Sequence, residues 1–262
     1  LESMKKRYRI KFPASSSARL GQDEVFFSLI ENGEVRRLRF HDYAEIYKRP
    51  GLYEQIFYDR LKCNSPGKVA DLLQRALNTV REPLNELRVL DLGAGNGMMG
   101  EALKRDGVAR LVGADIIPEA RDAAYRDRSE VYDDYYVADF ASLDDEILEE
   151  LRDWSFDCLT CVAALGFGDI PPRAFFNAMK LVRTDGWLAF NIKETFLDHN
   201  EHSGFSRLVR ELVFSKYVDI YHLELYRHRL SMEGTQLFYY ALVGRMTASI
   251  PPNFLEEHGI ED

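Results

Sequence analysis

A run of glycines directly follows an apolar segment in the first half of the chain. Residues 89–92 are apolar apart from Asp91, and they lead into Gly93, Ala94, Gly95, Asn96 and Gly97. Glycine adopts positive φ angles without strain and lets a ligand approach the main chain closely. Open α/β sheets bind ligands at the carboxyl ends of their strands. The segment therefore predicts a ligand-binding loop after the first strand of such a sheet.

Two acidic residues follow later predicted strands. Asp115 ends the strand predicted over residues 110–115, and Asp139 follows the strand predicted over 135–138. The carboxyl ends of parallel strands share one edge of a sheet, so both carboxylates could accept hydrogen bonds from a ligand bound there. The alternative is that each acid is satisfied by solvent or by a helix N-terminus.

A second way of aligning the glycines has to be weighed. Gly95, Gly97 and Gly100 also satisfy the G-x-G-x-x-G pattern of dinucleotide-binding folds, and Asp115 lies 20 residues after Gly95. An NAD(P)-dependent oxidoreductase is therefore an alternative function. The position of Gly93 directly after the strand, the second acid Asp139, and a predicted antiparallel hairpin at the end of the sheet argue against it.

The elements that must position these residues form an alternating pattern. Short apolar strands are predicted at residues 88–92, 110–115, 135–138, 156–162 and 186–192, with helices near 98–106, 118–127, 144–152 and 172–183. Such alternation is typical of a parallel sheet with helices on both faces. A helix near 205–214 and two longer β-prone runs, 217–229 and 235–245, follow, and the runs predict a closing antiparallel hairpin.

The first 82 residues carry a different pattern. Two β-prone runs, 24–30 and 34–40, flank Asn32-Gly33, which is a strong hairpin signal. An aromatic-rich helical stretch follows, and Tyr53, Phe57 and Tyr58 are predicted to form the inner face of a lid over the ligand site. Core packing is the alternative for these rings. We predict an N-terminal hairpin and helical cap over 1–82, a cofactor-binding domain over 83–247 and a C-terminal tail over 248–262.

The ordered motifs resemble those of class I S-adenosylmethionine-dependent methyltransferases. The resemblance is carried by residues 89–97, 113–116, 137–140 and 156–162, and residues 93–103 with 128–140 look most like Williams–Beuren-like bacterial small-molecule methyltransferases. It implies a Rossmann-like, mostly parallel seven-stranded α/β sheet with an antiparallel last strand. It also implies S-adenosyl-L-methionine as the cofactor, S-adenosyl-L-homocysteine as the product, and direct in-line methyl transfer to a small molecule.

The resemblance further implies roles for individual residues. Gly93, Ala94 and Gly95 would line the methionine part of the cofactor, and Asp91 would help to hold its amino group. Asp115 would bind the ribose hydroxyls, with Ile116 packing on the adenine. Asp139 would bind the adenine amino group and Phe140 would donate its backbone N–H to the ring. Val162 would approach the sulfonium centre.

No residue in the sequence stands out as the catalytic base. A hydroxyl acceptor needs a general base, whereas a neutral amine needs only a route for proton loss. His199, His202 and His228 are weak candidates because they follow the fifth strand. The pair His199 and His202 could also be imagined as metal ligands, but a solvated loop is the preferred interpretation and we predict no metal. A fold that binds cofactor without turnover is a further alternative.

Composition limits the partners. The formal net charge is −9 and the pI about 5.3, so the average surface repels nucleic acid. No stretch approaches the roughly 20 apolar residues of a membrane-spanning helix. The chain contains three cysteines and no recognisable export signal, and we predict a cytoplasmic location. The aromatic N-terminal segment could instead mediate an oligomer contact.

Overall fold

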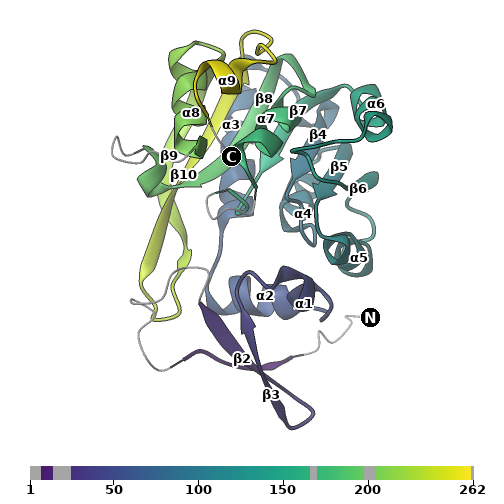
Figure 1. The fold of residues 1–262 in the computed structure, drawn as a ribbon, viewed down its shortest axis with the longest axis vertical. Coiled ribbons are helices and arrows are strands. Elements are labelled where there is room, and N and C mark those ends of the chain that lie inside the picture. Colours follow the sequence, from purple (N-terminus) through teal and green to yellow (C-terminus); the bar gives the residue numbers. More distant parts are fainter. Residues whose placement is uncertain (1–6, 14–24, 166–169, 198–203, 261–262) are drawn as a thin grey trace.

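The computed structural model describes residues 7–13, 25–165, 170–197 and 204–260. Its main element is a seven-stranded sheet with strand order β6-β5-β4-β7-β8-β10-β9 (Figure 1). The strands are β4 (Arg88–Leu92), β5 (Arg110–Asp115), β6 (Asp134–Val137), β7 (Phe156–Cys161), β8 (Val182–Lys193), β9 (Val218–Leu230) and β10 (Gln236–Met246). The prediction of a Rossmann-like sheet is confirmed.

The last strand in the chain runs against its neighbours. β10 is antiparallel to both β8 and β9, while β4 pairs in parallel with β5 and β7. A doubly wound dinucleotide-binding sheet instead contains two similar parallel halves. The topology therefore differs from the oxidoreductase alternative. It also brings the carboxyl ends of β4, β5, β6 and β7 to one edge.

Helices cover both faces of this sheet. They are α3 (Ser65–Val80), α4 (Met98–Arg105), α5 (Pro118–Asp127), α6 (Asp145–Asp153), α7 (Pro172–Met179), α8 (Gly204–Phe214) and α9 (Phe254–Glu257), with short 3-10 turns η4 (Leu84–Glu86) and η5 (Glu194–Leu197). Side chains of a strand alternate between faces. Val89 accordingly packs with residues of α3 and α4, and the next residue, Leu90, packs in the cluster that contains residues of α6, α7 and α8.

Two segments that were predicted to lie in the cap and in a C-terminal tail pack against the sheet domain. Helix α3 lies within the region predicted as a cap, but its apolar face packs against β8, β9, β10 and α4. Residues 248–260, predicted as a tail, insert Phe254 and Leu255 into the core beside α7. Both segments carry large apolar side chains, and burial against the sheet removes them from water.

The cap itself is a small sheet with two short helices. It contains β1 (Arg9–Lys11), β2 (Phe26–Glu31), β3 (Glu34–Arg39), α1 (Tyr43–Tyr47), α2 (Leu52–Glu54) and the π-helical turn η3 (Gln55–Arg60). The predicted hairpin is confirmed, since Asn32 and Gly33 both have positive φ and β2 pairs with β3. The cap has a core of its own around Phe27, Leu29 and Ile56.

Two connections hold the cap against the sheet domain. Helix α1 packs on α5, where Tyr47 contacts Ala120 and Ala123. On the other side, the long β9–β10 hairpin extends beyond the sheet towards the cap (Figure 1), and Leu230 donates a backbone hydrogen bond of 2.6 Å to the carbonyl of Leu61. The cap therefore lies across the edge where the parallel strands end.

Candidate active site

The loop after β4 is built from positive-φ glycines and backbone hydrogen bonds. Gly93 and Gly95 have φ angles of 67° and 54°. The N–H of Ala94 donates to the carbonyl of Ala114 at 3.0 Å, and the Tyr135 hydroxyl donates to the carbonyl of Gly95 at 2.8 Å. A Cβ atom at Gly95 would lie 2.4 Å from the hydroxyl oxygen of Tyr47. The predicted loop is therefore present, and Gly95 leaves space that a larger residue would fill.

The carboxylate of Asp115 lies beside this loop. It accepts a hydrogen bond of 2.9 Å from the N–H of Gly95 and one of 3.0 Å from the N–H of Ile117. These two bonds fix the carboxylate at the end of β5, and each carboxylate oxygen can accept more than one hydrogen bond. A preorganised carboxylate of this kind is suited to binding vicinal hydroxyl groups.

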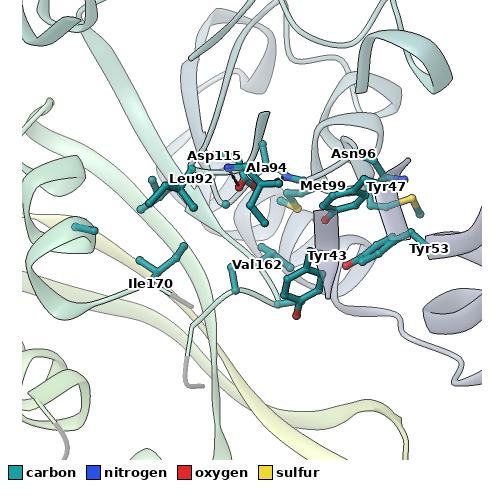
Figure 2. A pocket seen from close by; sticks show the side chains of 18 of the residues that line it. Tyr43, Tyr47, Tyr53, Leu92, Ala94, Asn96, Met99, Asp115, Val162 and Ile170 are labelled. Atoms are coloured by element: carbon teal, nitrogen blue, oxygen red, sulfur yellow. Dashed lines mark hydrogen bonds between the residues drawn. The ribbon is translucent and has the colours of Figure 1, made fainter. Parts of the chain in front are cut away.

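A cavity of about 370 Å³ opens between the loop and the cap. Figure 2 shows Tyr43, Tyr47 and Tyr53 grouped on one side of it, opposite Leu92 and Ile170. The lining also includes Gly93, Ala94, Gly95, Asp115, Ile116, Asp139, Phe140 and Val162. Eight of the nine residues predicted for cofactor binding thus lie around one cavity.

The ninth residue, Asp91, lies beneath the loop and does not line the cavity. Its carboxylate is 1% exposed and accepts hydrogen bonds of 2.7 Å from both Tyr132 and Thr160. Burial raises the pKa of Asp91 to about 6, although both hydrogen bonds favour the charged form. Asp91 therefore supports the loop from below.

The predicted adenine-side residues lie at the rim of the cavity. Ile116 is 59% exposed, which is unusual for a large apolar side chain and leaves a surface on which a ring could pack. Asp139 is exposed and its carboxylate accepts a hydrogen bond from the N–H of Ala141 at 2.8 Å. A backbone N–H of the following turn therefore satisfies part of the hydrogen-bonding capacity of the Asp139 carboxylate.

The aromatic cap residues contribute more than the sequence indicated. Tyr53 and Tyr58 line the cavity as predicted, but Phe57 lines a second cavity next to it. Tyr47, which the sequence did not predict on the inner face of the lid, also lines the cavity. It is 6% exposed, and burial raises its pKa well above the usual value. Its position follows from the packing of α1 on α5, which no local pattern encodes.

Arg128 connects the cap to the loop, a role that no local sequence pattern indicates. Its guanidinium forms an ion pair of 2.9 Å with Glu54 in α2, and it also donates to the carbonyl of Asn96 at 3.2 Å and to Glu101 at 2.8 Å. The Arg128 and Glu54 side chains are only 7% and 11% exposed. The pair therefore holds α2 against the glycine loop.

The three candidate bases are not brought together at the cavity. His199 and His202 lie outside the described residues. His228 lies on β9, is 5% exposed and lines the second cavity. Within the described part of the chain, no cluster of histidine, cysteine, aspartate or glutamate side chains could hold a metal ion, and no helix is long and apolar enough to cross a membrane.

Comparisons with known proteins place the cavity in a family context. Residues 90–190 match the model of the methyltransferase domain family. Among solved structures, the N-methyltransferase NodS from Bradyrhizobium japonicum in complex with S-adenosyl-L-homocysteine is similar, with 13% identity, 80% of this chain and 98% of that chain covered, and a TM-score of 0.52. A candidate RNA methyltransferase from Pyrococcus horikoshii has 12% identity, coverage of 70% and 84%, and a TM-score of 0.51.

No curated protein matches the chain. The structural similarities, at such low identity, show the shared fold. Residues 90–190 therefore carry a methyltransferase domain, in a chain with the fold of the class I S-adenosylmethionine-dependent methyltransferases. The similar structures include proteins described as acting on different acceptors, so they do not specify the acceptor of this chain.

Proposed function

We propose that the 370 Å³ cavity binds S-adenosyl-L-methionine and that the methyl group passes in line to a small-molecule acceptor. The observation that supports the proposal most directly is the Asp115 carboxylate, held by the N–H groups of Gly95 and Ile117 beside a loop without side chains at Gly93 and Gly95. A Cβ atom at Gly93 would come within 2.7 Å of Ala164, so the glycine loop is shaped to pass close to its neighbours.

The residues present fit this cofactor. In the proposed arrangement, Asp115 binds the ribose hydroxyls, Ile116 packs on the adenine, and Asp139 and Phe140 bind its edge. The buried amide oxygen of Asn96 has no hydrogen-bond partner among the described residues, and a bound ligand or an ordered water satisfies groups of this kind. Asp91 acts indirectly, because its hydrogen bonds with Tyr132 and with Thr160 of β7 hold the end of β4 below the loop.

The bound cofactor supplies an electrophilic methyl group: the acceptor atom bonds to the methyl carbon as the carbon–sulfur bond breaks, and the bond electrons pass to sulfur to give S-adenosyl-L-homocysteine. The acceptor loses one proton. The chain contributes orientation and exclusion of water, which supply much of the rate of such a displacement. Val162 and Ala163 after β7 and the tyrosines of the cap enclose the place where acceptor and methyl group would meet.

The cap favours a small acceptor over a polymer. Tyr43, Tyr47 and Tyr53 form consecutive ring contacts, with centroids 6.1 Å and 5.2 Å apart, along one side of the cavity. The formal charge of −9 adds electrostatic repulsion against nucleic acid. The Williams–Beuren-like subgroup and the cytoplasmic location stay predictions from the sequence.

Calorimetric titration tests the cofactor site. We expect S-adenosyl-L-homocysteine to bind saturably to the native protein, and NAD and NADP not to bind. Asp115→Ala should weaken binding at least about thirtyfold, since hydrogen bonds to a charged group contribute about 1.5–3 kcal/mol each. Asp122→Ala removes an exposed acid on α5 that pairs with Arg121, and should leave the affinity unchanged.

The proposal fails if a dinucleotide binds instead, or if Asp115→Ala binds S-adenosyl-L-homocysteine as tightly as the native protein and the Asp122→Ala control do. Asp115 also holds Gly95 and Ile117, so Asp115→Asn is a second variant that preserves the shape of the side chain. Circular dichroism of each variant establishes that it is folded.

A further inference from the structure

A second cavity of about 210 Å³ adjoins the cofactor cavity. The two cavities share His41, Tyr43, Tyr53 and Ala163 in their linings. The second cavity lies between the cap and the β9–β10 hairpin, and its apolar lining includes Phe40, Phe57, Met232 and Leu237. A ligand bound there would lie next to whatever occupies the cofactor cavity, with its apolar surface against these side chains.

A bulge in β9 changes which side chains face this cavity. In the pairing of β9 with β10, Leu237 lies opposite Arg229 and the next residue, Phe238, lies opposite Arg227, so His228 is the extra residue. Neighbouring residues of a regular strand point to opposite faces, but a bulge redirects side chains. His228 and Arg229 consequently both line the second cavity, whereas Arg227 is exposed.

A chain of four hydrogen bonds orients His228. The N–H of Ala163 donates to Oδ1 of Asn191 at 2.7 Å, and Nδ2 of Asn191 donates to the hydroxyl of Tyr226 at 2.8 Å. The Tyr226 hydroxyl donates to Oγ of Ser65 at 2.7 Å, and Oγ lies 2.6 Å from Nδ1 of His228.

The direction of this chain determines where the histidine proton lies. The Tyr226 hydroxyl donates to Oγ of Ser65, and we take the Ser65 hydroxyl to donate in turn to Nδ1 of His228. The single proton of the neutral imidazole is then on Nε2. Burial lowers the pKa of His228 to about 3, so the ring is neutral near pH 7. Among the described residues Nε2 has no hydrogen-bond partner, and it is a donor.

Arg229 is a second donor at the same cavity, and it carries a charge. Its guanidinium donates to the carbonyl of Leu230 at 3.0 Å. Within the described part of the chain it forms no ion pair, whereas Arg49, Arg88 and Arg128 each contact a carboxylate. A partly buried guanidinium without a carboxylate partner beside an N–H donor is suited to binding an anion.

We propose that the second cavity holds the methyl acceptor, a small molecule with an apolar body and a carboxylate group that Arg229 and His228 bind. The nucleophilic atom of this acceptor lies towards Ala163 and Tyr53, where the two cavities meet. The cavity is large enough for one substituted ring, since a protein cavity of about 150 Å³ holds benzene. This inference rests on the proposed function, because it assigns the cofactor to the neighbouring cavity.

Calorimetry with simple aromatic acids tests the inference. Benzoate, phenylacetate and 4-hydroxybenzoate are titrated into the protein saturated with S-adenosyl-L-homocysteine, and 4-hydroxybenzamide serves as the uncharged match. We expect at least one acid to bind saturably and the amide to bind at least about tenfold more weakly than its acid. Arg229→Gln should weaken acid binding at least about tenfold and leave amide binding unchanged.

Two controls keep the result interpretable. Arg227→Gln removes the exposed neighbouring arginine, and its acid affinity should equal that of the native protein. Arg229→Lys retains the positive charge and should bind the acid better than Arg229→Gln does. Undisturbed binding of S-adenosyl-L-homocysteine to each variant shows that the fold is intact.

The inference is overturned if none of the acids binds while S-adenosyl-L-homocysteine does, if acid and amide bind equally, or if Arg229→Gln leaves acid affinity unchanged. If S-adenosyl-L-homocysteine itself does not bind, the proposed function fails separately. The acids are then titrated alone: Arg229-dependent binding still supports the anion site, and absence of binding overturns it.

Discussion

The two adjoining cavities are built in different ways. The proposed cofactor cavity lies between the cap and the loops that follow β4, β5, β6 and β7, and its glycine loop depends on main-chain contacts such as those of Gly95 and Asp115. The second cavity is formed by side chains from the cap, the β7 loop and the β9–β10 hairpin. A site made from one strand–loop motif can be recognised locally, whereas a site between distant segments depends on how they pack.

Breaking the ion pair of Arg128 and Glu54, which joins the cap to the glycine loop, should have the largest effect on the free energy of unfolding. Arg128→Met leaves the buried Glu54 carboxylate without its partner, and breaking such a pair costs about 3–5 kcal/mol in free energy of unfolding. Urea denaturation measures this cost. Affinity for S-adenosyl-L-homocysteine should fall as well, because the same guanidinium binds the Asn96 carbonyl.

The exposed pair of Arg121 and Asp122 provides the matched control. Arg121→Met should cost less than about 1 kcal/mol, as is usual for pairs in solvent. An Arg128→Met variant as stable as this control would show that the cap is not held by the ion pair. Adding Glu54→Gln to Arg128→Met should restore part of the stability, since it removes the unpaired charge.

The buried titratable groups beside the two cavities should change stability with pH in opposite directions, because burial raises the pKa of Asp91 and lowers the pKa of His228 to about 3. The folded-state pKa of Asp91 is raised to about 6, against about 3.9 in an unfolded chain. Between pH 4 and 6 the folded state therefore binds more protons than the unfolded state, and this contribution to stability is full below pH 4 and lost as pH rises to 6. Two pKa units correspond to roughly 3 kcal/mol.

Asp91→Asn removes this titration and keeps one acceptor oxygen, while its NH2 group can donate to the other of the Tyr132 and Thr160 hydroxyls. The difference in free energy of unfolding between native protein and variant, measured in urea from pH 4 to 8, should slope between pH 4 and 6 and be flat above. A difference without slope in that window would show that the Asp91 pKa is not raised.

The smallest expected effect is a loss of affinity at the second cavity that leaves binding in the proposed cofactor cavity unchanged. Tyr226→Phe interrupts the hydrogen-bond chain between Asn191 and Ser65 and should cost about 1–2 kcal/mol in unfolding free energy. It should weaken binding of the aromatic acids about three- to tenfold, because His228 is no longer oriented, and leave S-adenosyl-L-homocysteine affinity unchanged. Equal losses for both ligands would contradict the separation.

Tyr217→Phe is the control for this substitution. The Tyr217 ring packs edge-on against Phe254, and its hydroxyl forms no hydrogen bond with the described residues. Its removal should change neither affinity.

The sheet domain and its glycine loop could be predicted from the sequence alone. Residues 88–92 and 110–115 were predicted as strands with the bounds that the structure shows, and the pattern of glycines and acids placed eight residues around one cavity. The physical reason is that the carboxyl ends of parallel strands share an edge, so residues that follow such strands meet without further information. The exception, Asp91, points below the loop because strand side chains alternate between faces.

The second cavity and the attachment of the cap depend on tertiary packing. Nothing local marks Arg128 as the partner of Glu54, or Ser65 as the partner of His228 and Tyr226, since these contacts join residues 74, 163 and 161 positions apart. In a regular strand, neighbouring residues such as His228 and Arg229 would face opposite sides. A single-residue bulge, set by pairing with β10, brings both side chains to the same cavity.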